Sequence, residues 1–132
     1  MLFRSVTVKL VAKPKLARVI MASFDDIEKG GNAVAAIIAA GIIPAGLEMM
    51  DKATTRAVEE FVHAGYDLDA AAILLCESDG TPEEVAEEIE RMTKVLEQAG
   101  ASGIQISKDE ADRKSTRLNS SHSQQSRMPS SA

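Results

Sequence analysis

The spacing of hydrophobic residues changes several times along the chain, and each change predicts a secondary-structure element. Apolar and polar residues alternate over residues 6–12, which predicts a half-buried strand because successive side chains of a strand point to opposite faces. Short apolar or alternating runs, bounded by Gly, Pro or charged residues, predict further strands. These strands are expected at residues 17–22, 45–50, 70–76 and 104–108.

Helical spacing of the apolar residues predicts three helices between these strands. Ser23 is expected to cap the first helix, which ends at Ala40, and Asp51 to cap the second, which ends at Ala64. The sequence Thr-Pro-Glu-Glu at residues 81–84 is typical of a capping box at the start of the third helix. The expected buried positions are Ala57, Val58, Phe61 and Val62 in the second helix and Val85, Ile89, Met92, Leu96 and Ala99 in the third.

The order strand, strand, helix, strand, helix, strand, helix, strand favours an α+β fold. We expect a ferredoxin-like, largely antiparallel sheet with helices on one face. Ser78, Asp79 and Gly80 are expected to form the turn that leads from a buried strand into the third helix.

The composition changes sharply after residue 111. Residues 112–132 hold seven Ser and four Lys or Arg but no Val, Ile, Phe or Tyr, which predicts a disordered polar tail. Residues 112–122 and 126–132 also resemble the translation of a sequencing-library adapter, and residues 1–5 resemble the translation of its complementary strand. We therefore expect an artefactual leader at residues 1–5, an artefactual tail at residues 112–132 and a natural segment between them.

The segment between these flanks is strongly acidic. The whole chain has a net charge of -5, whereas residues 6–111 keep ten basic and nineteen acidic residues, a net charge of -9. This charge excludes a nucleic-acid binder, which would show a basic stripe. No apolar run approaches the roughly 20 residues of a membrane-spanning helix, and no signal peptide is visible, so we expect a cytoplasmic protein. The one Cys cannot build a disulfide framework or a zinc site alone.

Glu48 and Asp51 are the candidate pocket-facing residues. Glu48 interrupts an otherwise apolar sequence at residues 45–50, where a carboxylate must face solvent, be paired or line a pocket. Asp51 follows closely and is also the expected helix cap. Two interpretations stay open for both residues: solvent exposure or capping, and a role in a pocket.

Other residues that could carry chemistry have structural explanations. His63 lies late in a helix, where it complements the helix dipole, and Cys76 ends a buried strand as a small apolar residue. Gly30 and Gly31 lie inside a helical pattern and so do not form a phosphate loop. The glutamates of residues 83–90 surround an exposed helix and are not expected to bind a metal ion. The sequence therefore assigns no catalytic residue, cofactor-binding residue or metal ligand.

Three stretches of the natural segment carry a resemblance to a known family. They are VTVKLVAKP at residues 6–14, AGIIPAGLEMMD at residues 40–51, and AAILLCESDG at residues 71–80 followed by a helix with EEVAEEIERM. These stretches closely resemble the FAD-linked oxidases of the vanillyl-alcohol oxidase type, in the branch of glycolate oxidases and D-lactate dehydrogenases. The resemblance implies that residues 6–14 are the exit strand of a missing FAD-binding domain and that residues 15–111 are part of the C-terminal cap domain.

The resemblance also implies a function for a parent enzyme. The family oxidises small 2-hydroxy acids of the glycolate or D-lactate type by hydride transfer to flavin. The expected partners are the 2-hydroxy acid and iron–sulfur or other electron-transfer subunits. FAD is expected in the parent enzyme, whereas this piece alone is expected to bind no cofactor and to be inactive. Two alternatives stay open: a free-standing ferredoxin-like module that binds a small ligand or oligomerises without catalysis, and a polypeptide that no cell makes as written.

Overall fold

The computed structural model of the protein describes residues 4–10, 12–108 and 112. The elements in this part of the chain are β1 (Leu16–Phe24), α1 (Ile27–Ala39), β2 (Gly46–Asp51), α2 (Lys52–Val62), β3 (Ala72–Gly80), α3 (Pro82–Gln98) and β4 (Gly103–Ile106). Most of the leader and tail expected from the sequence, residues 1–3 and 113–132, lies outside the described residues.

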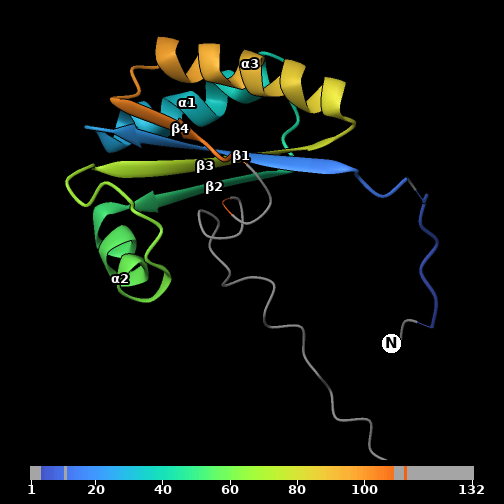
Figure 1. The fold of residues 1–132 in the computed structure, drawn as a ribbon, viewed down its shortest axis with the longest axis horizontal. Helices are drawn as coiled ribbons and strands as arrows, with labels where there is room; N and C mark the ends of the chain where they lie inside the picture. The colour runs from blue at the N-terminus through green and yellow to red at the C-terminus, as the bar shows by residue number, and fades with distance from the viewer. Residues whose placement is uncertain (1–3, 11, 109–111, 113–132) are drawn as a thin grey trace, which may run out of the picture.

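The strands of the described residues form one antiparallel sheet in the order β2-β3-β1-β4 (Figure 1). Helix α1 connects β1 to β2, and α3 connects β3 to β4, so that two strand–helix–strand units interleave in the sheet. This is the ferredoxin-like arrangement. The α+β class and the ferredoxin-like sheet predicted from the sequence are therefore confirmed.

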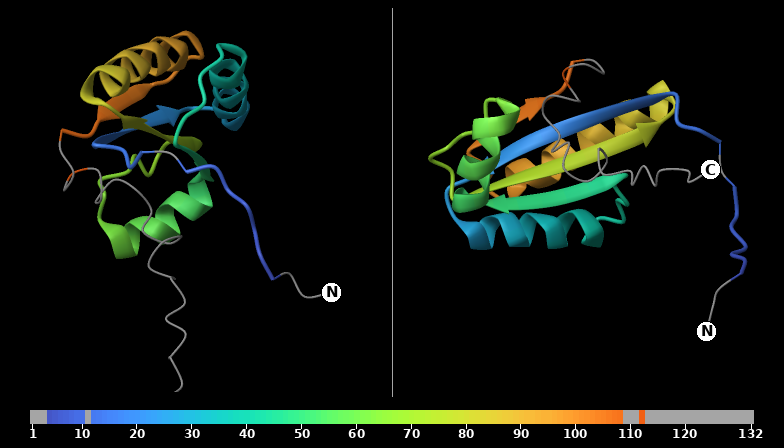
Figure 2. Two further views of the ribbon diagram at one scale, coloured as in Figure 1. Left: turned by 90° about the vertical axis from the view of Figure 1, so that its right-hand side faces the viewer. Right: turned by 90° about the horizontal axis from the view of Figure 1, so that it is seen from below.

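Helices α1 and α3 cover one face of the sheet (Figure 2). Alternate residues of the central strands point into this layer, because successive side chains of a strand face opposite ways. Four of the five residues predicted for the stripe of the third helix are buried and supply the other side of the core, whereas Ala99 is the C-cap after α3 and is only partly buried. The principal residues of this core are Ile20, Ala22 and Phe24 of β1, Leu74 and Cys76 of β3, Ala33 and Ile37 of α1, and Val85, Ile89, Met92 and Leu96 of α3.

Helix α2 lies against the opposite face, as the two views in Figure 2 show. Helix α2 belongs to the connection between β2 and β3. Its Val58 packs against strand residues that point away from α1 and α3, among them Val19 and Leu75. The expectation of helices on one face therefore applies to α1 and α3 but not to α2.

The buried positions expected for α2 need a correction. Ala57 and Phe61 were expected in the core, but Ala57 is exposed and Phe61 is 84% exposed, whereas Thr55 is buried. Thr55 and Val58 are three residues apart and share the face that reaches the sheet, since neighbours at this spacing lie one above the other on a helix. An apolar residue that is not on this face stays in solvent.

The strand expected at residues 6–12 is absent from the described part of that range, residues 6–10 and 12. Val6, Val8 and Leu10 are all exposed, and the segment runs away from the sheet in Figure 1. Alternation alone does not make a strand, because a strand needs a neighbour for its backbone hydrogen bonds, and no described strand pairs with this segment.

The turn expected at residues 78–80 is wrong as well. Strand β3 continues through Gly80, which pairs with Leu16 at the start of β1, and Ser78 pairs with Arg18. The hydrogen-bonding partner on β1 holds these polar residues in the sheet. The helix start at Thr81 is as predicted, with the Thr81 side chain and the Glu84 side chain forming a reciprocal capping box.

Candidate functional site

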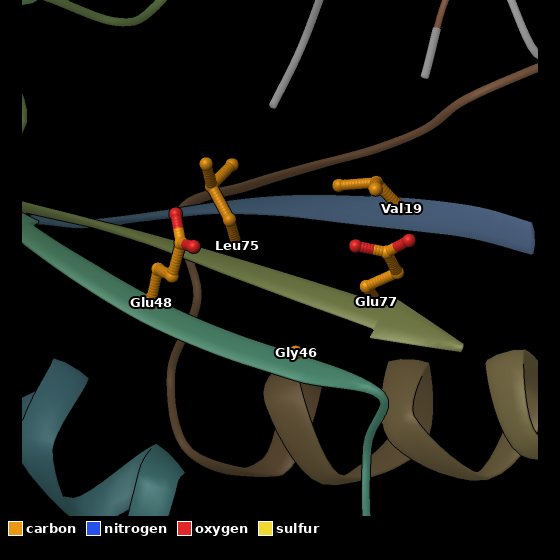
Figure 3. Close-up of a pocket in the computed structure, with 5 residues that line it drawn as sticks. All are labelled: Val19, Gly46, Glu48, Leu75 and Glu77. Atoms are coloured by element: carbon orange, nitrogen blue, oxygen red, sulfur yellow. The ribbon is translucent and has the colours of Figure 1, made fainter. Parts of the chain in front are cut away.

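A small hollow lies on the face of the sheet that α2 covers only in part. Its lining residues come from the three strands β1, β2 and β3, and they are Val19, Gly46, Glu48, Leu75 and Glu77 (Figure 3). Across β2 and β3, Gly46 pairs with Glu77 and Glu48 pairs with Leu75. The two glutamates are therefore diagonal neighbours on one face, within reach of the same small group.

The structure brings Glu48 together with Glu77 and not with Asp51. Glu48 is half-buried at the hollow, whereas Asp51 is exposed and caps α2, where its Oδ1 accepts a hydrogen bond of 2.8 Å from the Thr54 N–H. Sequence reasoning missed Glu77, which is only 8% exposed. The available signal was a carboxylate directly after the apolar run of β3, at a position that shares a strand face with Ile73 and Leu75.

The surroundings of the hollow are negatively charged. Burial, together with the charges of Glu59 and Glu48, raises the pKa of Tyr66 to about 12. The Tyr66 phenol is therefore protonated at neutral pH and can donate a hydrogen bond, but it cannot act as a base. Two carboxylates on one hollow favour a cation or a hydrogen-bond donor and repel an anion.

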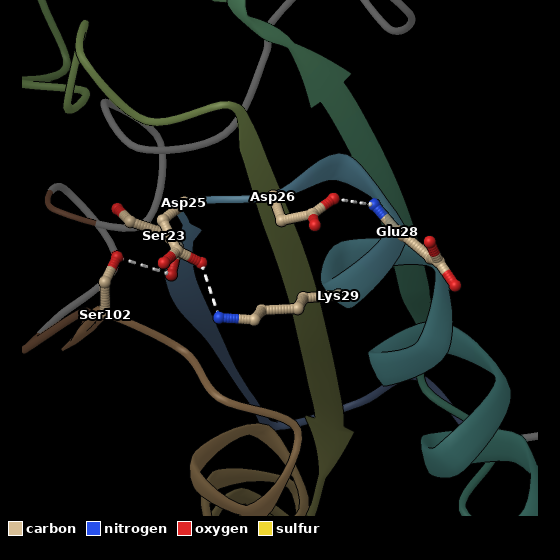
Figure 4. Close-up of polar contacts among 6 residues, drawn as sticks. All are labelled: Ser23, Asp25, Asp26, Glu28, Lys29 and Ser102. Carbon is tan, nitrogen blue, oxygen red and sulfur yellow. Dashed lines mark hydrogen bonds and ion pairs between the residues drawn. The ribbon is translucent and has the colours of Figure 1, made fainter.

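A second polar cluster lies at the corner between β1 and α1 (Figure 4). Asp26, and not Ser23, caps α1: its Oδ1 accepts the Glu28 N–H at 2.8 Å. Ser23 is still in β1, where its carbonyl accepts the Ser102 N–H at 2.8 Å and the Ser102 hydroxyl at 3.1 Å. The helix begins later than expected because the strand pairing holds the backbone extended through Phe24.

The other residues considered from the sequence have structural roles. His63 is the C-cap of α2 in a left-handed conformation, with φ of 51°. Cys76 is buried, and burial raises the pKa of its thiol to about 12, so it is no nucleophile at neutral pH. Within the described residues, no three His, Cys, Asp or Glu side chains converge as a metal site. No helix in the same part of the chain has the length and apolar character that a bilayer crossing requires.

The cap at Asp51 predicts a pH dependence of stability. Hydrogen bonds from Thr54 lower the pKa of Asp51, so the folded state favours the charged carboxylate. This contribution is complete above the unfolded pKa, near 3.8, and is lost as the pH falls through the lower folded pKa. Asn caps helices as well as Asp but does not titrate. We expect Asp51→Asn to make the fall in Tm between about pH 5 and pH 2 shallower.

Thermal unfolding followed by circular dichroism at a series of pH values measures this effect. Glu60→Gln is the control, because Glu60 is exposed on the same helix and caps nothing that the structure describes. A pH profile of Asp51→Asn that runs parallel to the wild type would contradict the contribution of this cap.

Comparison with known proteins gives the family. The model of the C-terminal domain of FAD linked oxidases matches residues 13–125. The chain belongs to the FAD-linked oxidase family. Glycolate oxidase subunit GlcD of Escherichia coli strain K12 is 57% identical to this chain over 108 residues, which is 82% of the chain and 22% of the relative. Subunit GlcD of Bacillus subtilis strain 168 is 34% identical over 105 residues, 80% of the chain and 22% of the relative.

A solved structure agrees with the fold of this chain. Alkyldihydroxyacetonephosphate synthase superposes with a TM-score of 0.62 and 15% sequence identity, covering 82% of this chain and 24% of that chain. The chain spans about a fifth of the length of the curated relatives it matches. The family match runs through residue 111 without marking a boundary there, so the domain limits expected at residues 5, 14 and 111 stay predictions.

The family name implies FAD, and the described residues of this chain do not fit the pyrophosphate of that cofactor. A pyrophosphate is held by glycine-rich backbone at a helix N-terminus. Here the three helix N-termini are occupied by the caps Asp26, Asp51 and Thr81, and Glu84 adds a further negative charge beside Thr81. Gly30, moreover, lies inside α1 and is buried. Among the described residues, the charges of Asp26, Asp51 and Glu84 would repel a pyrophosphate from these three helix N-termini.

Proposed function

We propose that this chain is part of the cap domain of an FAD-dependent oxidoreductase that oxidises a small 2-hydroxy acid of the glycolate or D-lactate type. The observation that carries the proposal is the 57% identity with glycolate oxidase subunit GlcD over 108 residues. The FAD-binding domain and the catalytic residues then belong to the rest of the complete enzyme. The chain itself contributes a sheet that helps to shape the substrate pocket, and its location in the cytoplasm stays a prediction.

Glu48 and Asp51 have different roles in this proposal. Glu48, with Glu77, lies at the hollow of the open sheet face, where a carboxylate can accept a hydrogen bond from a substrate hydroxyl. The same charges would repel the carboxylate of a 2-hydroxy acid, so its binding requires a cation from another part of the enzyme. Asp51 faces solvent and acts through the stability of α2. The relatives are named as subunits, and we infer that the complete protein assembles with iron–sulfur or other electron-transfer subunits.

The test of the proposal is made on the complete reading frame. Sequencing across both ends of the coding region gives the continuous frame that contains residues 6–111, and the encoded protein is then purified. We expect bound flavin in its visible absorption spectrum and bleaching of that spectrum when glycolate or D-lactate is added without oxygen. Acetate, which lacks the hydroxyl group, is the control and should leave the spectrum unchanged. A continuous frame without flavin, or a flavin that neither hydroxy acid reduces, would overturn the proposal.

A further inference from the structure

The turn after α2 binds a carboxylate of its own helix. The backbone N–H groups of three consecutive residues, 64–66, all donate to the side chain of Glu59, which lies on the last full turn of α2. The distances are 3.2 Å from the Ala64 nitrogen, 2.8 Å from the Gly65 nitrogen and 3.2 Å from the Tyr66 nitrogen. Successive N–H groups that converge in this way form a concavity suited to an anion.

The backbone at this turn is bent to make the concavity. His63 has φ of 51° and Gly65 has φ of 76°, both in the left-handed region. A left-handed conformation at a residue other than Gly has a steric cost, which the surrounding contacts must offset. The Glu59 carboxylate and the Glu59 carbonyl, which accepts the His63 N–H at 3.0 Å, are the contacts that do so here. One residue therefore holds the turn through both its backbone and its side chain.

The turn determines where Tyr66 goes. Tyr66 follows the left-handed Gly65 directly, is 5% exposed, and packs with Val19, Met21 and Leu75 on the face of the sheet that bears the hollow. Because its own N–H is one of the three donors to Glu59, the backbone of Tyr66 is fixed at the point where the ring enters the core.

The same turn is open to solvent on its outer side. A shallow surface depression there is lined by Arg56, Glu59, Glu60, His63, Leu68 and Asp69. Arg56 carries a permanent positive charge, which attracts an incoming carboxylate and partly offsets its repulsion by Glu60 and Asp69. Because Glu59 lines this depression, we expect removal of its side chain to open the N–H groups to a small carboxylate from this side.

We propose that the N–H groups of residues 64–66 form a carboxylate-binding cradle, that Glu59 occupies it as an internal ligand, and that this contact holds Tyr66 in the sheet face. The ligand class is a carboxylate, because the cradle consists of backbone donors that match its two oxygens. The inference depends only on the contacts of α2 and the following turn, and it stands whether or not the proposed function is correct.

The test uses Glu59→Ala in the full 132-residue chain, with Glu60→Ala as the matched control, since Glu60 is exposed on the same helix. The chain has one Tyr and no Trp, so its tyrosine fluorescence reports on Tyr66 alone. We expect acrylamide to quench Tyr66 several-fold more strongly in Glu59→Ala, and Tm to fall by about 5 °C or more. Glu60→Ala should match the wild type in both measurements.

Rescue by a small carboxylate distinguishes a carboxylate-binding cradle from a site where Glu59 only adds stability. Sodium acetate, compared with sodium chloride at equal ionic strength, should restore part of the Tm and of the quenching protection in Glu59→Ala. It should have no such effect on the wild type or on Glu60→Ala. Wild-type quenching in Glu59→Ala, or acetate that works no better than chloride, would overturn the proposal.

A second variant covers the case in which Glu59→Ala does not fold. Glu59→Gln keeps one acceptor oxygen but loses the charge, so we expect acrylamide to quench Tyr66 more strongly than in the wild type. Alkaline titration of Glu59→Gln is an independent measurement. In the wild type, burial and the charge of Glu59 raise the pKa of Tyr66 to about 12, so we expect this pKa to fall toward 10.0 in the variant. Glu59→Gln with the quenching and titration of the wild type would contradict this role of Glu59.

Discussion

Replacing Phe24 by alanine is expected to lower the free energy of unfolding by about 3–5 kcal/mol. Phe24 ends β1, has 0% exposure and is among the largest fully buried side chains of the described residues. Its ring lies in the core between the sheet and the helices α1 and α3. Removing the ring loses its transfer free energy and leaves a cavity that the paired strands cannot collapse to fill. Urea unfolding followed by circular dichroism measures the loss.

Phe61→Ala is the matched control, because it removes the same atoms from the exposed side of α2. We expect its free energy of unfolding to stay within about 0.5 kcal/mol of the wild type. Similar losses in the two variants would mean that α2 buries Phe61, which contradicts the orientation of the helix described above.

Gly30→Leu has the second-largest expected effect, a loss of about 1–3 kcal/mol in the free energy of unfolding. Gly30 lies in α1 on the side that faces the sheet, and a Cβ at this position would lie 3.2 Å from the Ala72 Cβ and 3.3 Å from the Met49 sulfur. The longer Leu side chain has no room there, so α1 must move away from β2 and β3.

The neighbouring Gly31 supplies the control, since a Cβ there meets no atom within 4 Å. Gly31→Leu is expected to stabilise the protein by up to about 1 kcal/mol, because Leu has the higher helix propensity at an exposed position. The two variants should therefore have effects of opposite sign in the same unfolding experiment. Destabilisation by both would indicate that Gly31 also faces a neighbour.

The local sequence was sufficient to predict the N-terminal caps of α2 and α3. Asp51 and Thr81 each accept a backbone N–H within three residues, so the whole interaction lies inside a short stretch of sequence. The buried stripe of α3 was equally accessible, because its apolar residues all lie on one face and charged residues surround them. In these places the sequence and the fold favour the same structure.

The errors came from interactions between distant residues. Ser23 and Ser78 are residue types that favour caps and turns, yet both lie in strands because β1 and β3 pair along their whole length. Residues 6–10 alternate like a strand, but no described strand lies beside them. Phe61 is apolar on a helix with one buried face, and only the placement of α2 over the sheet decides which face that is.

The candidate site was predictable in part for the same reason. Glu48 was conspicuous as a carboxylate within an apolar strand, which requires no knowledge of the partner strand. Its neighbour Glu77 comes from β3, and the two meet only through the register in which Glu48 pairs with Leu75. A shift of the register by one residue would place one of the glutamates on the other face, and the sequence alone does not fix that register.

The central position of β1 has a consequence for synthesis on the ribosome. Among the described strands β1 is made before the other three, and both of its neighbours in the sheet, β3 and β4, follow α1, β2 and α2. At about 5–20 residues per second, the interval between the end of β1 and the end of β3 is on the order of several seconds. During that interval β1 has neither of the strands that flank it in this sheet, so its apolar residues and unpaired backbone groups are open to pairing with other chains.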